Sequence, residues 1–471
     1  MAEATAERMA QAEQAENSQL PWWVRYMRWR PTSHEEGVKA ERKLLSLCSS
    51  PVNIQDVPVG PKKHEYMHTI TSGAASAPNL VCIPGYGAGA SFFFRNVDGL
   101  SRNYRTHLVD LLGTGLSGRP TFRAKNLQQT EDFFLNALSK WRQEQGIDKM
   151  VLVGHSLGGF LAATYALRHP EHVEHLVLVC PAGVAKKPED YRDPHVVSSP
   201  WTWRGQLFRL AKTMWNFGMT PGVVVRSLGP WGPNLIAKYS RNRFKEGLGL
   251  TEDEVAAFEQ YFYHIMAANG SGEFALRHIL QPFAWAAHPL EGRLQDLKVP
   301  VTFIYGEYDW MDPKGGKRVC ADIKASRGPL SAADLHVAEI PSAGHYPFLD
   351  QPELFLQALV QQTKYLLPQP PQSMPPPGTT ARPTHLSNAP LTDSANSLND
   401  MAVENGVGKH SSLDEMAVEN VVSKHSSLDE MAVEGGGSTA AGHGGGGVRD
   451  WKPNDLRMGN MRKYGFRTET D

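Results

Sequence analysis

The stretch Val151-Leu152-Val153-Gly154-His155-Ser156-Leu157-Gly158-Gly159 decides the fold. It combines a short buried strand, the pattern G-x-S-x-G and the start of a helix. This order places a serine on a tight strand-to-helix turn, where its hydroxyl projects above a parallel sheet. Glycines two residues to either side prevent clashes with neighbouring chain. The stretch therefore predicts Ser156 as a nucleophile, and the alternative is a structural turn serine.

Alternating strand and helix patterns extend on both sides of this stretch, from about residue 50 to 367. Helical patterns at 130–141 and 160–167 separate short apolar runs. This rhythm predicts a mostly parallel sheet with helices on both faces. The expected strands are Leu80–Ile83, Thr106–Val109, Val151–Val153, His175–Val179, Val299–Tyr305 and Leu335–Ile340.

The strand pattern stops between residues 184 and 292, a part rich in Trp, Phe, Met and Arg. Its run Thr251-Glu252-Asp253-Glu254 is typical of a capping box that opens a helix over 255–268. We expect 184–292 to be an all-helical cap over the carboxyl ends of the strands. The α/β core would then consist of 48–183 and 293–367.

A nucleophilic serine needs an acid and then a histidine later in the chain. The run Ile340-Pro341-Ser342-Ala343-Gly344-His345 places a histidine just after the last expected strand, so His345 is predicted as the base. The turn after the preceding strand offers Asp309, three residues after a glycine, and Asp312 as an alternative acid. We expect Asp309 to orient the imidazole of His345.

The loop Ile83-Pro84-Gly85-Tyr86-Gly87-Ala88-Gly89 follows an early strand. We expect the backbone N–H groups of Tyr86 and Leu157 to bind the oxyanion, and an ordinary glycine-rich turn is the alternative. The loop is not a phosphate-binding P-loop because no Gly-Lys-Ser/Thr follows it. Asp110, in a later loop, is interpreted as structural.

The predicted base also begins the run His345-Tyr-Pro-Phe-Leu-Asp350, an H-x4-D pattern associated with glycerolipid acyltransferases. In those enzymes the histidine acts as a base towards the acceptor hydroxyl and the aspartate orients it. A structural alternative is that Asp350 caps the next helix, with Glu353 at its third position.

Composition excludes several classes of protein. A net charge of −1 over 471 residues argues against nucleic-acid binding, which needs a concentrated positive face. The four cysteines, Cys48, Cys82, Cys180 and Cys320, lack metal-ligand or redox spacing, so reduced thiols in a cytosolic compartment are expected. No metal site and no bound cofactor are predicted. We find neither a signal-peptide core nor an apolar run of the roughly 20 residues that would span a bilayer.

The two ends of the chain have distinct compositions. Residues 1–20 are expected to be a disordered leader, and 368–471 a disordered tail with a Pro-rich linker and a 15-residue repeat that begins MAVEN. Residues 21–47 begin PWWVRYMRWRP and continue into an expected amphipathic helix from about residue 32. Interleaved Trp and Arg suit a membrane interface or lipid-droplet surface. We therefore expect a cytoplasmic protein that is peripherally associated with lipid droplets or membranes.

Together these features resemble an α/β-hydrolase subfamily. It includes the lipid-droplet coactivator of triglyceride lipase, an N-acyl phospholipid lipase and plant lysophosphatidic acid acyltransferases. The resemblance covers about residues 20–367. It rests on the Trp-rich segment followed by Pro31-Thr32-Ser33, and on Gly154–Gly159, Asp309–Asp312 and His345–Asp350. The extended form most resembles the plant branch.

The resemblance implies the α/β-hydrolase fold with a helical cap. It also implies an enzyme that acylates lysophosphatidic acid, with acyl-CoA as a possible co-substrate, and that hydrolyses phospholipid acyl esters. A non-catalytic coactivator with a separate lipase as its partner is the alternative. That branch resembles this chain but has Asn in place of the nucleophile, whereas Ser156 is present here. Some relatives place their acid at the position that matches Asp312.

Overall fold

The computed structural model describes residues 32–189, 202, 206, 209, 213, 219–244, 251–281, 285–326 and 330–368. The predicted leader, the tryptophans of the N-terminal segment and the predicted tail beyond residue 368 lie outside the described residues. None of the helices in the described ranges has the length and apolar character needed to cross a membrane.

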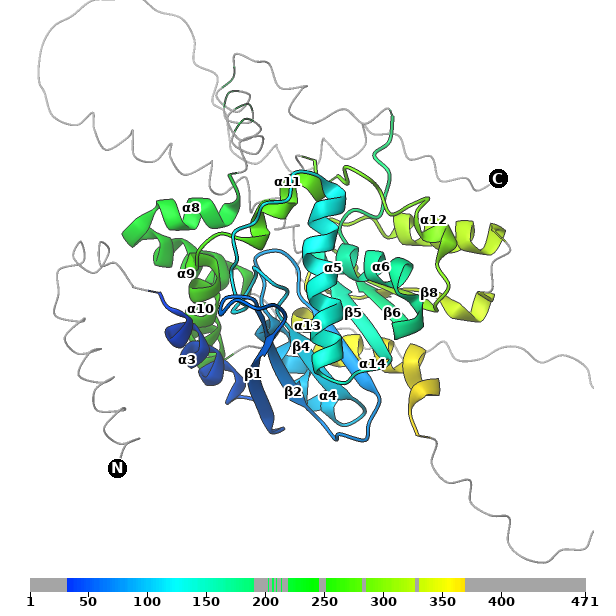
Figure 1. Ribbon diagram of the computed structural model, residues 1–471, viewed down its shortest axis with the longest axis horizontal. Helices are drawn as coiled ribbons and strands as arrows, with labels where there is room; N and C mark the ends of the chain where they lie inside the picture. The colour runs from blue at the N-terminus through cyan, green and yellow to red at the C-terminus, as the bar shows by residue number, and fades with distance from the viewer. Residues whose placement is uncertain are drawn as a thin grey trace, which may run out of the picture. The chain divides into compact units, whose positions relative to one another are not determined.

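An eight-stranded sheet forms the centre of the described part, in the order β1-β2-β4-β3-β5-β6-β7-β8 (Figure 1). Strands β4, β3, β5, β6, β7 and β8 are parallel, whereas β1 and β2 run antiparallel at one edge. The strands are β1 Val52–Pro58, β2 Tyr66–Ser72, β3 Asn79–Ile83, β4 Arg105–Val109, β5 Met150–His155, β6 Val173–Val179, β7 Val301–Gly306 and β8 Leu335–Ile340.

The six predicted strands correspond to β3 through β8 and are confirmed. Strands β1 and β2 were not predicted. Strand β1 carries Gln55 and Asp56, ends in Pro58 and is only partly buried. An antiparallel edge strand needs only one buried face, so it lacks the continuous apolar run that marks a central parallel strand.

Helices cover both faces of the sheet, and neighbouring residues of a strand belong to different cores. In β5, Leu152 packs in the core formed with α5, α6 and α12. Val151 packs in the core formed with α3, α4, α10 and α14. The helices of the α/β core are α3 His34–Leu45, α4 Val97–Ser101, α5 Leu127–Glu144, α6 Leu157–Arg168, α12 Pro313–Ala325, α13 Pro347–Asp350 and α14 Pro352–Thr363. Short 3₁₀ helices are η1 Ala90–Asn96, η2 Pro170–His172, η6 Leu294–Asp296, η7 Ala332–Asp334 and η8 Lys364–Leu366.

The described part of 184–292 is helical, apart from one isolated antiparallel bridge between Leu280 and Ala286. The predicted capping box is confirmed: Thr251 and Glu254 exchange side-chain and backbone bonds at the start of α10. Helix α10 packs against α3 (Figure 1). The elements of this part are α8 Pro221–Ser227, η3 Gly229–Trp231, α9 Gly232–Phe244, α10 Glu252–Ala267, η4 Gly272–Ala275 and α11 Leu276–Ile279.

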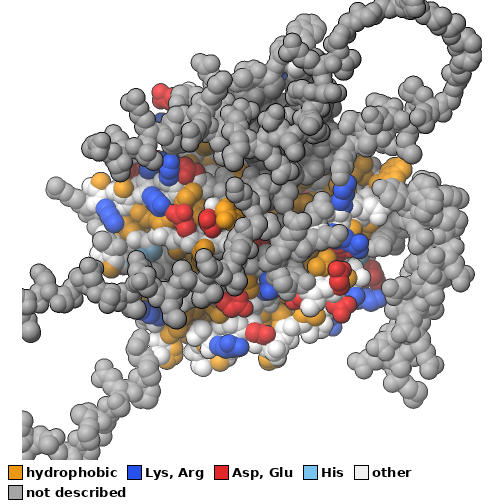
Figure 2. Space-filling view, turned by 180° about the vertical axis from the view of Figure 1, so that it is seen from behind, with side chains coloured by type: hydrophobic (Ala, Val, Ile, Leu, Met, Phe, Trp, Pro, Cys, Tyr) orange, Lys and Arg blue, Asp and Glu red, His pale blue; other side chains and the backbone are white. Residues whose placement is uncertain are grey.

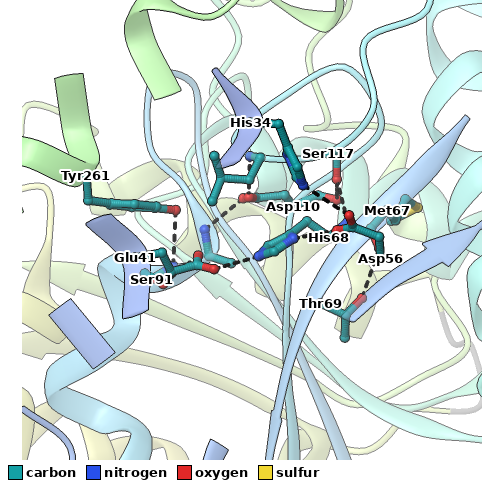
Figure 3. Close-up of polar contacts among 12 residues, drawn as sticks. His34, Glu41, Asp56, Met67, His68, Thr69, Ser91, Asp110, Ser117 and Tyr261 are labelled. Atoms are coloured by element: carbon teal, nitrogen blue, oxygen red, sulfur yellow. Dashed lines mark hydrogen bonds and ion pairs between the residues drawn. The ribbon is translucent and has the colours of Figure 1, made fainter. Parts of the chain in front are cut away.

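A buried charged cluster fastens α3 to the sheet and to the cap (Figure 3). His68 of β2 bonds Glu41 of α3 through Nε2 and Asp56 of β1 through Nδ1, both at 2.6 Å. Burial opposes a charge on His68, but the two carboxylates outweigh it and raise its pKa to about 10. Ser91 donates to Glu41, and its own N–H donates to the hydroxyl of Tyr261 in α10. The cluster therefore connects the N-terminal helix, the sheet edge and the cap.

Charged side chains of both signs are visible on one face of the described part. On the face seen in Figure 2, Lys and Arg side chains lie interspersed with Asp and Glu side chains. Six large hydrophobic side chains in the described ranges are exposed, and two of them, Tyr308 and Trp310, lie in the loop after β7. The others are Leu47, Trp231, Leu354 and Tyr365.

Candidate active site

Ser156 lies on the turn between β5 and α6, with φ 51° and ψ −117°. A positive φ is strained for a residue other than glycine and is typical of a functional turn. A Cβ on Gly154 would lie 2.5 Å from the carbonyl oxygen of Gly158, and a Cβ on Gly158 would lie 2.4 Å from that of Pro84. Both positions therefore require glycine because β5, α6 and the end of β3 approach so closely.

Three predicted residues form one hydrogen-bonded series. Nε2 of His345 lies 3.1 Å from Oγ of Ser156, and Nδ1 of His345 lies 2.9 Å from Oδ1 of Asp309. The side chain of Asp309 is fully buried. Asp309 follows β7 and His345 follows β8, so the carboxyl ends of neighbouring parallel strands bring both residues to the serine.

The other two candidate aspartates lie elsewhere. Asp312 is exposed, and its side chain accepts from the N–H of Lys314 at the start of α12. Asp350 is buried and accepts from the N–H of Gly344 at 2.8 Å. The two ring nitrogens of His345 face Ser156 and Asp309. Asp350 therefore binds the backbone amide of Gly344, just before the base, and not the imidazole.

The alternative that Asp350 caps the following helix is wrong. The N-cap of α14 is Gln351, and its side chain makes no capping bond. Asp350 is the last residue of the separate helix α13, so its carboxylate turns back to Gly344 and not forward to α14.

The two backbone amides predicted to bind the oxyanion belong to segments next to Ser156. Leu157 is the first residue of α6, a position whose N–H has no partner within the helix. The Pro84–Tyr86 backbone passes against the nucleophile, since a Cβ on Gly85 would lie 2.7 Å from Cβ of Ser156. Within the described ranges, no hydrogen bond occupies the Tyr86 amide. The oxyanion role of Tyr86 and Leu157 stays a prediction.

Asp110 holds the far end of the same loop, as its structural interpretation requires. Its two carboxylate oxygens accept from the N–H of Ala90, at 2.7 Å, and of Leu116, at 2.8 Å. Burial raises its pKa to about 6. Asp110 therefore joins the loop after β3 to the loop after β4.

Sequence reasoning missed two side chains beside the base. Nε2 of His155 lies 2.8 Å from the carbonyl oxygen of His345. Complete burial, followed by the nearby His345, lowers the pKa of His155 well below 6.5, so a neutral ring donates this bond. The ring of Trp310 lies 5.1 Å from that of His345. His155 occupies a variable position of G-x-S-x-G, so the motif gave no signal for it.

Cys180, at the end of β6, lies beside the acid. Its Sγ, a carboxylate oxygen of Asp309 and a ring nitrogen of His345 lie within 4.8 Å of one another, a spacing that a metal ion could use. Burial, with Asp309 adding, raises the pKa of the thiol well above 9, whereas a metal needs the thiolate. The bond between His345 and Asp309 also occupies two of the donor atoms. These residues fit a catalytic triad better than a metal centre.

Residues 78–352 match the family model described as alpha/beta hydrolase fold. The chain is 37% identical to a "Probable 1-acylglycerol-3-phosphate O-acyltransferase" of Oryza sativa subsp. japonica, over 73% of this chain and 85% of that protein. It is 36% identical to the "(Lyso)-N-acylphosphatidylethanolamine lipase" of Bos taurus, over 60% and 78% of the two chains. It is 31% identical to "1-acylglycerol-3-phosphate O-acyltransferase ABHD5" of Mus musculus, over 69% and 88%. The predicted subfamily and the greater similarity to the plant branch are confirmed.

Proposed function

Because this chain belongs to the α/β-hydrolase family, we propose that it is a serine-dependent enzyme of phospholipid metabolism. In this proposal it transfers lipid acyl groups to lysophosphatidic acid, to give phosphatidic acid, and also hydrolyses phospholipid acyl esters. The main support for the proposal is that His345 lies within hydrogen-bond distance of both Ser156 and Asp309. The names of the relatives from rice and cattle support the lipid substrate.

In the first half of the reaction, Oγ of Ser156 attacks the acyl carbonyl carbon while its proton passes to Nε2 of His345. The carbonyl oxygen becomes an oxyanion that binds the N–H groups of Tyr86 and Leu157. Asp309 holds Nδ1–H and stabilises the imidazolium. The bond to the leaving group then breaks, and His345 gives its proton to that group. The leaving group is CoA thiol or a lysophospholipid hydroxyl, and Ser156 carries the acyl group.

In the second half, an acceptor hydroxyl attacks the acyl-enzyme. His345 takes the proton of the acceptor and returns it to Oγ of Ser156 as the ester bond to the serine breaks. A lysophosphatidic acid hydroxyl yields phosphatidic acid, whereas water yields a free fatty acid. The balance depends on how well the site excludes water. Acyl-CoA enters this scheme as a co-substrate, and no bound cofactor is required.

A lipid surface as the place of action is part of the proposal. The exposed side chains of Tyr308 and Trp310 flank Asp309, so apolar surface borders the triad. Such aromatic side chains suit the interface between water and lipid. The Trp-rich stretch at 22–29 suits the same surface, which favours a cytoplasmic protein at the periphery of lipid droplets or membranes.

The test uses purified protein and its Ser156→Ala variant with labelled lysophosphatidic acid, with and without acyl-CoA. Phosphatidic acid that forms only with acyl-CoA, and not in the variant, is the expected result. Free fatty acid alone would limit the activity to hydrolysis. Transfer that survives in Ser156→Ala would contradict the serine mechanism. No turnover of either kind would favour the non-catalytic coactivator, which then predicts stimulation of a separate triglyceride lipase.

A further inference from the structure

The side chain of Tyr86 leaves the loop after β3 and enters the cap. Its hydroxyl oxygen accepts from the N–H of Gly222, in the first turn of α8, at 3.2 Å. These residues lie 136 positions apart in the chain. One residue therefore connects the loop beside Ser156 to a helix of the cap.

The cap side of this contact is itself fixed by a buried network. Thr220 caps α8 and donates to Oε1 of Glu273 at 2.8 Å. Arg226, in the same helix, forms an ion pair with Glu273. A Cβ on Gly222 would lie only 2.5 Å from Oε2 of Glu273, so the start of α8 rests directly on this carboxylate. The position of the Gly222 amide within the cap is consequently fixed.

The phenol of Tyr86 is suited to a structural contact and not to proton transfer. Burial, with the charge of Glu273 adding, raises its pKa to about 12. The hydroxyl therefore stays protonated throughout the physiological range. Its role lies in holding position.

The backbone of the same residue lies at the reacting centre. The preceding Gly85 packs against Ser156, as the close approach of its Cβ position shows. A shift of the Tyr86 side chain would therefore move the amide that the proposed reaction assigns to the oxyanion. Removal of one oxyanion donor costs about 10²- to 10³-fold in kcat, so even a partial displacement is measurable.

We propose that Tyr86 is a positioning residue. Through its phenol, the geometry of the oxyanion hole depends on the position of α8 against the core. The hole is complete only while α8 rests on the core, so that acyl transfer proceeds in the closed, water-poor state of the site. This inference rests on the proposed function, since it assigns the Tyr86 amide to the oxyanion of that reaction.

The test compares Tyr86→Phe with Tyr104→Phe. Tyr104 makes a buried hydrogen bond to Thr363 at 2.6 Å, at a place that the catalytic scheme does not use, so this control loses a bond of the same kind. In Tyr86→Phe we expect kcat to fall about 10- to 100-fold with KM little changed. Labelling of Ser156 by a fluorophosphonate should slow by a similar factor, because its phosphoryl oxygen enters the same hole. In Tyr104→Phe both rates should stay near wild type.

A second variant acts from the cap. Glu273→Gln removes the charge that holds Arg226 and should lower kcat in the same direction, although Glu273 belongs to the cap. It also provides the test if Tyr86→Phe fails to fold. Hydrogen exchange in residues 84–90 should quicken in both variants.

If Tyr86→Phe keeps the kcat and the labelling rate of the wild type, the coupling is refuted. The serine mechanism would still stand, provided that the probe labels the wild-type enzyme. Equal losses in Tyr86→Phe and Tyr104→Phe would also overturn the coupling, because they would indicate a general loss of packing. A wild-type protein that neither reacts with the probe nor turns over lipid would refute the proposed function, and the coupling with it.

Discussion

The carboxylate of Asp350 binds the backbone amide of Gly344 at 2.8 Å, one residue before His345. The buried aspartate of the H-x4-D pattern thus fixes the loop that carries the base. Asp350→Ala should lower hydrolysis and transfer together, on the order of 10- to 100-fold, because the imidazole loses its register with Ser156. Asp350→Asn, which retains an oxygen acceptor, should keep more of both rates. Parallel assays of fatty acid and phosphatidic acid check this, and a loss confined to transfer would instead support a separate chemistry of His345 and Asp350.

Asp309 and Asp312 should respond differently to the same change. Asp309→Asn should lower kcat roughly 10³- to 10⁴-fold, because the amide favours the wrong tautomer of His345. Asp312→Asn should leave kcat near wild type, since Asn also caps helices and the side chain is exposed. Steady-state rates and thermal unfolding of both variants provide the comparison. A large loss of activity in Asp312→Asn alone would mean that the resting geometry misidentifies the acid.

The charged cluster at His68 predicts a pH dependence of stability. Its pKa is about 10 in the folded protein, against an ordinary value of 6.5. The stabilisation is therefore fully present below pH 6.5 and is lost as the pH rises through 10. His68→Gln should lower the free energy of unfolding by about 3 kcal/mol at pH 7, because Glu41 and Asp56 lose their cation. Urea unfolding between pH 7 and 10 should show a steeper decline for wild type, and parallel curves would argue against a charged His68.

Gly85 offers a steric test of the loop beside the nucleophile. A Cβ there would lie 2.7 Å from Cβ of Ser156, so Gly85→Ala must displace either the loop or the serine. We expect at least a roughly 100-fold loss of kcat from such a shift. Gly60→Ala is a suitable control, because the atoms nearest to its Cβ belong to the side chain of Glu65 and its closest contact is the movable carboxylate. Similar kcat values for the two variants would show that the loop yields without cost.

The sequence predicts the parts of the site that depend on local geometry. Ser156 is recognisable because nine consecutive residues contain the sequence patterns of a strand, a strained turn and the start of a helix. His345 is recognisable because it lies in the turn after the last strand, which ends at Ile340. The choice between Asp309 and Asp312 depends on the conformation of the loop after β7. The position three residues after the glycine favours Asp309, which is the residue that bonds His345 in the structure.

Contacts between distant segments leave no such mark. The bond from Gly222 to Tyr86 and the cluster of Glu41 with His68 join parts of the chain whose separation the sequence does not reveal. Strand β1 escaped prediction because one-sided burial at a sheet edge permits polar residues. Strand β2 escaped it because the buried polar residues His68, Thr69 and Ser72 interrupt its apolar run. Asp350 was ambiguous because a carboxylate before Pro352 can cap a helix or fold back, and packing decides between them.

The antiparallel strands at the sheet edge also affect where a recombinant fragment of this protein should begin. The family match begins at residue 78, after α3, β1 and β2. A recombinant fragment that starts there would expose β4, which normally pairs with β2 through four residue pairs from Thr69 to Ser72. An uncovered strand of this kind invites self-association. Expression should therefore include α3, β1 and β2, so that β4 remains paired with β2.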